Sequence, residues 1–450
     1  MKTKFSQMET REVNIDFTAR QGPFTFRNHS FGIGGINHLP MPQKVIQGIK
    51  KLQPKLIRIF LQEFFFVYPD HNVFDWAKMD AYVESVHEMG ADIMAHICIK
   101  PKPLYPVVDE NVWEPTSVTE WQTLIKAMVC RYSIEKKYIT HWAIANETNI
   151  GEWGGCPYLF DCPKEYFGYY KITAQAIVSA GANVKIGGPA WAGTGDNLAE
   201  FLDTFFALVK EENLPLDFIS YNFYSNSPDV LVKESAYFKS LAEKFSPSLE
   251  VYITELNVGL GAVSEDEAHT GARAASLAAT LIALSSQNLL NGTFQYHIVD
   301  QHCNMDDFAV FFERYRYMSE HWNDGPHKLG LFDWDGNPRP QYFMYELLYK
   351  MCGELVSTTA DGDLYNVTTC TNDTVNILVC NFGPEEPTDY NVVLKLKNNP
   401  CGLFNYVVDR VDDIPRTKPV ESRTVYMGED FYCKIYAPAY SVTLVQISKS

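Results

Sequence analysis

The sequence predicts an α/β fold in which a (β/α)8 TIM barrel carries an accessory antiparallel β-sandwich. Up to residue 352, short apolar runs alternate with helical patterns. Runs that are apolar throughout, rather than alternating, indicate parallel strands covered on both faces. Beyond residue 353, short β-rich runs follow one another without a helical period, which is typical of a sandwich. A chain of 450 residues also exceeds one ordinary core and favours two domains.

The barrel strands are expected at 31–37, 56–61, 91–97, 139–145, 184–188, 218–223, 251–254 and 292–298. The helix at 75–89 buries every third or fourth residue and stops at Gly90. Ser117 and Glu120 form a capping box that opens the next helix. Further helices are expected at 165–179, 197–210, 268–285 and 341–352. The whole series suits a barrel of ~250 residues enlarged by insertions.

An open doubly wound sheet is the rival fold, because Gly32 and Gly34 on the first strand faintly resemble a dinucleotide-binding turn. The third glycine of that motif is Asn37 here, and no strong helix start follows. The sequence therefore favours the closed barrel.

The second domain is predicted from strands at 365–369, 374–381, 391–397, 404–411, 432–437 and 441–448. Residues 12–17 alternate between apolar and polar side chains, and we expect them to add a strand to the same sandwich. The predicted organisation is thus an N-terminal strand region at 1–28, a catalytic barrel at 29–352 and a β-sandwich at 353–450.

The composition of the chain limits the classes of molecule that we expect it to bind. The net charge of −17, without a basic cluster, argues against nucleic-acid binding. No stretch reaches the roughly 18–20 apolar residues of a membrane span. The aromatic fraction of 14% suits a ligand with flat apolar faces, as sugars have, and equally suits ordinary core filling. The oligomeric state stays open, a homo-oligomer included.

Several features favour a cytoplasmic location. The first residues show no continuous apolar signal segment. Cys156 and Cys162 share a loop and could pair, but without such a signal we expect reduced thiols. Asn146 begins an N-x-[ST] glycosylation pattern next to the glutamate that stands out below, where a glycan would block the site.

Two glutamates stand out at predicted strand ends. In residues 141–147 (HWAIANE) and 251–255 (VYITE), an apolar run ends abruptly in Glu147 and Glu255. The carboxyl ends of barrel strands collect on one face, where catalysis takes place. Other polar or aromatic residues at predicted strand ends are Asn37, Arg58, His96, Asn146, Trp191, Asn222, Tyr224 and His297.

A carboxyl pair of this kind fits glycoside chemistry. At a separation of roughly 5–5.5 Å, one carboxylate can attack an anomeric carbon while the other protonates the leaving oxygen. The acid then needs a raised pKa, and the nucleophile needs hydrogen-bond donors that keep it ionised. Metal-dependent hydrolysis is disfavoured because no H-x-H or H-E-x-x-H spacing occurs. We expect neither a metal nor an organic cofactor.

Three motifs carry a resemblance to a known family. Residues 142–149 (WAIANETN) resemble the W-x-x-x-N-E-P-N motif of glycoside hydrolase family 39, within the retaining clan A. Residues 253–257 (ITELN) resemble its I-T-E-x-N motif, and residues 329–340 (LGLFDWDGNPRP) resemble its G-L-x-x-x-D-G-x-P-K-P passage. The order of the motifs and the sandwich after the barrel also match that family.

The resemblance implies a role for each matching residue. Glu147 would be the general acid/base and Glu255 the nucleophile. Asn146 would contact the 2-hydroxyl of the sugar, Arg58 would support the charge of the nucleophile, and Tyr224 would hydrogen-bond to Glu255. The implied protein is a retaining, exo-acting β-glycosidase similar to β-xylosidases, which hydrolyses an oligosaccharide or glycoside by double displacement.

Departures from the family pattern leave the sugar open. Thr148 replaces the usual proline after the acid, and Phe60, Asn222 and His297 occupy positions where the family has other pocket residues. A galactoside, a glucoside or an arabinoside remains an alternative substrate, and so does a binding protein that has lost catalysis. The loop at 150–163, with its Trp153 and Tyr158, is the expected wall for the leaving group, with a packed surface loop as the other interpretation.

Overall fold

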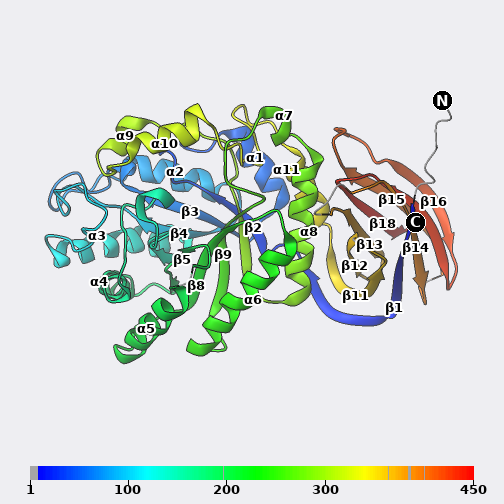
Figure 1. Cartoon of the computed structure of the whole chain (residues 1–450), viewed down its shortest axis with the longest axis horizontal. Coiled ribbons are helices and arrows are strands. Elements are labelled where there is room, and N and C mark those ends of the chain that lie inside the picture. The colour runs from blue at the N-terminus through cyan, green and yellow to red at the C-terminus, as the bar shows by residue number, and fades with distance from the viewer. Residues whose placement is uncertain (1–8, 196, 363, 384–386, 400) are drawn as a thin grey trace.

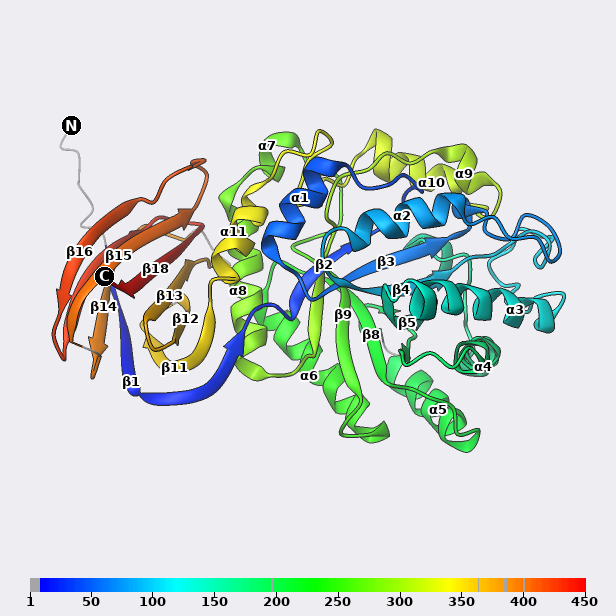
Figure 2. The same cartoon turned by 180° about the vertical axis from the view of Figure 1, so that it is seen from behind.

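The computed structural model describes residues 9–195, 197–362, 364–383, 387–399 and 401–450. A barrel and a β-sheet domain lie side by side, and both views show helices α8 (Gly271–Gln287) and α11 (Pro340–Leu348) between them (Figures 1 and 2). The Cys380 thiol from the sheet domain hydrogen-bonds to the carbonyl of Ala275 in α8 at 3.2 Å. One cluster of buried apolar residues also spans both domains, from Leu281 of α8 to Leu378 and Leu444 of the sheet domain.

The barrel is one closed parallel sheet. Its strands are paired in the order β6-β5-β4-β3-β2-β10-β9-β8-β7, and an additional β6–β8 pairing closes the ring. The fold class predicted from the sequence is confirmed. The strands are β2 (His29–Ile33), β3 (Leu56–Gln62), β4 (Asp92–Cys98), β5 (Ile139–Ile144), β6 (Lys185–Gly187), β7 (Trp191–Ala192), β8 (Phe218–Tyr224), β9 (Glu250–Asn257) and β10 (Gly292–Tyr296).

Helices surround this ring and cover its strands (Figure 1). The Ser117 side chain accepts a hydrogen bond from the Glu120 N–H at the start of α3, as the capping box predicts. In addition to α8 and α11, the helices of four or more residues are α1 (Gln43–Leu52), α2 (Ala77–His87), α3 (Val118–Val129), α4 (Pro163–Ser179), α5 (Leu198–Glu211), α6 (Pro228–Phe245), α7 (Glu265–Ala268), α9 (Met305–Ala309) and α10 (Tyr315–Ser319). Short turns of 3-10 or π-helix are η1 (Glu63–Phe65), η2 (Cys130–Glu135), η3 (Gly151–Gly154) and η4 (Glu320–Asp324).

The second domain is a single, mostly antiparallel sheet that curls until it is nearly closed around its own apolar core. The N-terminal strand β1 (Glu9–Thr25) pairs antiparallel with β11 (Cys352–Ala360) and parallel with β14 (Tyr390–Lys397). Alternate side chains of β14 point into the core. The remaining strands are β12 (Leu364–Cys370), β13 (Thr374–Asn381), β15 (Gly402–Val411), β16 (Glu421–Met427), β17 (Phe431–Ala437) and β18 (Ser441–Lys449).

Among the residues that the structure describes, no helix combines the length and the apolar character that crossing a membrane requires.

Candidate active site

Glu147 follows β5 at the carboxyl end of the barrel strands. The backbone turns sharply there, with positive φ angles of 68° at Ala145 and 42° at Glu147. The Glu147 N–H donates a hydrogen bond to the carbonyl of Ala190 at 2.6 Å, which holds this turn against the neighbouring strand segment. The residue is 9% exposed. The strained turn thus places a nearly buried carboxyl group at the mouth of the barrel.

Glu255 lies on β9 and receives two donors. A guanidinium nitrogen of Arg58 on β3 lies 2.9 Å from its Oε1. The hydroxyl of Tyr224 on β8 donates to its Oε2 at 2.6 Å. Burial raises the pKa of Tyr224, and the Glu255 charge adds to this effect, so the hydroxyl stays protonated. The Glu255 carboxyl group is thus held between a cation from β3 and a hydroxyl donor from β8.

Two asparagines connect the carboxyl groups. Asn146 Oδ1 accepts hydrogen bonds from Arg58 at 2.7 Å and from Asn222 at 3.3 Å. Asn222 Nδ2 also donates to Glu147 Oε1 at 3.0 Å, and its Oδ1 accepts from the Thr254 hydroxyl at 2.8 Å. One buried network therefore spans β3, β5, β8 and β9.

The surroundings of Glu147 favour its protonated form. Burial holds the pKa of the Glu147 carboxyl well above its usual range, and the nearby charge of Glu255 acts in the same direction. The hydrogen bond from Asn222 opposes this shift. One carboxyl group is thus biased toward the neutral acid, while its neighbour is surrounded by donors.

Both carboxyl groups line one narrow pocket of about 70 Å³. Phe60 forms part of the wall, and the Arg58 guanidinium lies 3.8 Å above the centre of its ring. Gly154 packs directly on the Glu147 carboxylate, where a Cβ atom would overlap the carboxyl oxygen. The other lining residues are Gly35, Ile36, Trp153, Gly155, Tyr224, Leu260, Tyr296, Tyr317, Met318, His321, Trp322 and His327.

Sequence comparison identifies the family. The model of glycosyl hydrolases family 39 matches residues 55–433. This chain belongs to glycosyl hydrolase family 39. The resemblance predicted from the three motifs is therefore confirmed, and the chain is a glycoside hydrolase by family.

Known relatives agree with this assignment. This family 39 chain is 25% identical, over 381 residues, to a β-xylosidase of Caldicellulosiruptor saccharolyticus, a match that spans 76% of this chain and 70% of that enzyme. A β-xylosidase of Geobacillus stearothermophilus is 28% identical over 178 residues, which is 34% of the length of either protein. The crystal structure of the family 39 enzyme from Xanthomonas axonopodis pv. citri has the same fold, with a TM-score of 0.77, 18% identity, and coverage of 100% of this chain and 99% of that one.

Of the predicted substrate contacts of the family 39 chain, Tyr224 lines the pocket. Arg58, Asn146 and Asn222 do not line it but belong to the network of the two carboxyl groups. The other four lie elsewhere. His96 is fully buried, and its Nδ1 lies 3.1 Å from the carbonyl oxygen of Ala145, so it supports the turn before the acid. Trp191 packs its ring at 4.6 Å from Phe201 of α5. Neither side chain is among the residues that line the pocket.

Asn37 and His297 are placed similarly. Asn37 donates to the carbonyl of His302 at 2.9 Å and accepts from the Leu39 N–H at 3.0 Å, which joins two loops. His297 is fully buried and packs at 5.5 Å from Trp322, behind the pocket wall. The preceding residue, Tyr296, lines the pocket instead.

The loop at 150–163, which follows Glu147, contributes some side chains to the core and others to the pocket. Tyr158, an expected part of the leaving-group wall, is fully buried, and its hydroxyl donates to the carbonyl of Ile99 at 2.7 Å. Trp153 lines the pocket and remains 53% exposed. Cys156 is buried and Cys162 partly buried, and each is a free thiol in the described chain.

Sequence reasoning missed most of the roof of the pocket. Tyr317, His321, Trp322 and His327 come from one long excursion between β10 and α11. This stretch has no strand and only short helical turns, so strand-end counting passes over it. In the sequence, the dense run of aromatic residues and histidines in this stretch is the signal that could have identified it as part of a ligand site.

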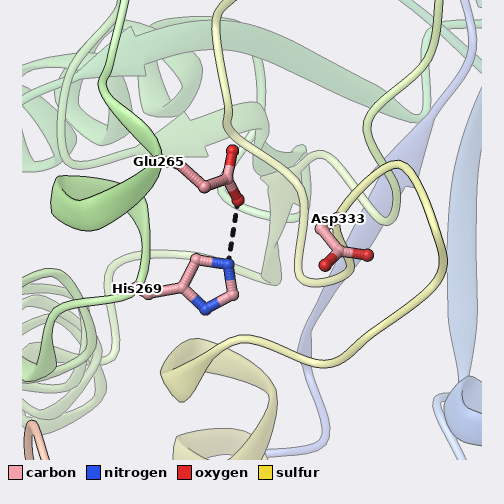
Figure 3. Close-up of side chains that lie close together, drawn as sticks. All are labelled: Glu265, His269 and Asp333. Carbon is pink, nitrogen blue, oxygen red and sulfur yellow. Dashed lines mark hydrogen bonds and ion pairs between the residues drawn. The ribbon is translucent and has the colours of Figure 1, made fainter.

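One group of side chains away from the pocket has the composition of a metal site. Figure 3 shows Glu265 and His269 of the α7 region in contact, with Asp333 on a neighbouring loop. Lys328 and Arg339 lie 3.2 and 3.5 Å from the Glu265 carboxylate. Asp333 accepts hydrogen bonds from backbone and side chain within its own loop. Ion pairs and hydrogen bonds within the protein thus account for this group.

Proposed function

We propose that this family 39 chain is a retaining, exo-acting β-glycosidase that removes a β-xylosyl unit or a related neutral sugar. The observation that carries the proposal is the contrast between the two carboxyl groups on one pocket. Glu255 forms an ion pair with Arg58 and accepts a hydrogen bond from Tyr224. Burial raises the pKa of Glu147, which favours its protonated form. A nucleophile and an acid need these opposite environments.

In the first step, the Glu255 carboxylate attacks the anomeric carbon of the sugar. The bond from this carbon to the leaving oxygen breaks while Glu147 delivers its proton to that oxygen. Arg58 and Tyr224 hold the attacking carboxylate in one orientation. In the proposed mechanism Asn146, which hydrogen bonds with Arg58 and with the Gly154 carbonyl at 3.1 Å hold next to Glu147, contacts the 2-hydroxyl of the sugar.

In the second step, the ester between the sugar and Glu255 is hydrolysed. Once Glu147 has lost its proton, it accepts a proton from the attacking water and returns to its acid form. The released Glu255 carboxylate regains its ion pair with Arg58 and its hydrogen bond from Tyr224. Two inversions at the anomeric carbon leave its configuration unchanged.

The lining of the pocket favours a single neutral sugar. Its volume of about 70 Å³ lies far below the roughly 300–1,000 Å³ of sites for drug-sized ligands, which suits one terminal unit. Among the described residues, no lysine or arginine lines it while two glutamates do, which disfavours the carboxylate of a uronide. Both β-xylosidase relatives are named for a neutral pentose, which supports a xyloside.

Trapping the intermediate tests the mechanism. A 2-fluoro-xylosyl donor should form a covalent adduct on Glu255, detected by intact mass and peptide mapping. Glu255→Ala should abolish turnover, and azide should rescue it with inverted configuration. Glu147→Ala should chiefly impair substrates with poor leaving groups, because only they require the proton. Full activity of Glu255→Ala on aryl glycosides, or an adduct on another residue, would refute the assignment.

We also propose a reducing, glycan-free compartment such as the cytoplasm. A glycan on Asn146 would occupy the active site, because this side chain is fully buried between Arg58 and Gly154. Ten free cysteines in the described chain agree with reduced thiols. Protein from its native source should have the unmodified mass and ten thiols that react after unfolding, and a glycan on Asn146 would contradict the proposal.

A further inference from the structure

Three loops are joined by charged side chains that the catalytic steps do not use, and two of these loops carry residues that line the pocket. Glu110 lies between β4 and α3, Glu152 lies in η3 after the acid, and Arg314 lies between α9 and α10. The side chains of Glu110 and Glu152 are 7% and 1% exposed. An unpaired carboxylate is unfavourable when buried. The partners of Glu110 and Glu152 therefore show how the three loops are held together.

The contacts form a closed set. Glu110 Oε2 accepts from the Glu152 N–H at 2.8 Å, and its Oε1 accepts from the Arg314 guanidinium at 2.5 Å. The Glu152 carboxylate accepts from the N–H groups of Glu313 and Arg314 at 2.9 and 2.8 Å. Each loop is therefore tied to both of the others. We call Glu110, Glu152 and Arg314 the ionic clamp.

The clamp adjoins the one exposed aromatic ring at the pocket among the described residues. The Arg314 guanidinium lies 5.0 Å from the centre of the Trp153 ring, and Tyr317 meets the same ring edge-on at 4.7 Å. Trp153 is 53% exposed although it lines the pocket. A broad ring held from two sides with its remaining surface open is suited to stacking against a flat ligand.

We propose that the ionic clamp fixes Trp153 as the platform on which the leaving group stacks, so that Arg314 is a positioning residue for the leaving-group sugar. This inference rests on the proposed glycosidase function. The sugar that reacts contacts Glu147 and Glu255 deeper in the pocket, and neither belongs to the clamp. The platform therefore acts on the departing sugar, and equally on a sugar acceptor that attacks the glycosyl-enzyme.

Loss of Arg314 should open the clamp. Glu110 and Glu152 would then keep their negative charges side by side without a cation, and like charges in a buried site repel. The loops would separate, and Trp153 would lose its cationic cover. Arg314→Lys keeps a positive charge for Glu110 but lacks the planar group over the ring, so it should restore only part of the function.

The test compares two substrates with one sugar and different leaving groups. For a disaccharide, Arg314→Ala and Trp153→Ala should each lower kcat/KM about tenfold, mainly through KM, while kcat for the p-nitrophenyl glycoside stays within about twofold. Transfer of the sugar to an added sugar acceptor should fall in parallel. Arg316→Ala, an exposed arginine on the same segment, is the matched control and should change neither value.

A double-mutant cycle decides whether Arg314 acts through Trp153. The double variant should be no worse than Trp153→Ala alone, and additive losses would overturn the inference. An unchanged ratio between the two substrates in Arg314→Ala would also overturn it. If Arg314→Ala does not fold, Arg314→Lys replaces it in the cycle with the same criterion. Wild-type protein inactive on every glycoside would instead refute the proposed function, which is a separate outcome.

Discussion

Replacing Glu63 by glutamine is expected to stabilise the protein progressively as the pH rises from acidic to neutral. Glu63 opens η1 at the end of β3 and is 6% exposed. Its Oε2 accepts a hydrogen bond from the Lys100 N–H at 2.9 Å. Burial raises the pKa of Glu63 to about 8, and the bond from Lys100 offsets only part of this shift. The side chain is thus protonated in the native protein at pH 7.

The magnitude follows from proton linkage. In the unfolded chain the carboxyl group has its ordinary pKa of 4.5, so at pH 7 it is ionised while the native group is not. Because the native pKa is raised, the associated stability is complete below pH 4.5 and is lost as the pH rises toward 8. At pH 7 the loss amounts to about 3 kcal/mol, from 1.36 kcal/mol for each pH unit above 4.5. Glutamine does not titrate and avoids this loss.

Urea unfolding of the two proteins at several pH values measures this effect. The difference in unfolding free energy between Glu63→Gln and the wild type should grow by about 3 kcal/mol from pH 4 to pH 7. Glu135→Gln, at an exposed position, is the control and should show a difference that does not depend on pH. A constant difference for Glu63→Gln as well would refute the reasoning.

Three further predictions concern the pocket. Gly154→Ala should displace the Glu147 carboxylate and lower kcat/KM on substrates with poor leaving groups by about 100-fold, and a change below threefold would contradict this. Asn222→Ala removes the donor that lowers the pKa of Glu147, so the basic limb of the pH–rate profile should move to higher pH. Movement to lower pH would contradict that role. Tyr224→Phe removes the 2.6 Å bond to Glu255 and should lower kcat/KM about 10- to 100-fold on every substrate, measured by steady-state kinetics.

Most of the barrel could be predicted because its strands are covered on both faces and read as apolar runs. Two strands of the other domain lacked any such signal. β11 is largely half-buried or exposed along its length, and β16 is mostly exposed as an edge strand. β11 pairs with β12 and with β1, which is distant in sequence. β16 pairs with β15 alone at the edge of the sheet. Helices α1 and α6 were also left out of the elements expected from the sequence.

The residues at the carboxyl ends of the barrel strands show how much of the site can be predicted from the positions of the strands. Arg58 lies on β3, Asn146 and Glu147 follow β5, and Asn222 and Tyr224 lie on β8. Hydrogen bonds and one ion pair join all of them to Glu255 on β9. A parallel barrel brings strand ends together whatever the loops do, so their common location follows from counting strands. Counting strands does not determine which side chain at a strand end faces the cavity.

The direction of the side chains at the end of β10 explains why the sequence predicts His297, rather than Tyr296, as a pocket residue. In a regular strand, consecutive side chains point to opposite faces, so an error of one residue at the strand end exchanges a pocket residue for a buried one. β10 ends at Tyr296, whose hydroxyl donates to the carbonyl of Gly34 at 2.7 Å. The ring is thereby fixed on the pocket side, and His297 turns behind it against Trp322.

The proposed leaving-group platform belongs to the region that sequence patterns describe least. The deep part of the pocket comes from strand ends, whose positions the barrel determines. The roof comes from the excursion between β10 and α11, which carries Tyr317, His321 and Trp322. Its position depends on ionic contacts with two other loops through Arg314. Substitutions in the clamp should therefore alter which leaving group is accepted before they alter the reaction itself.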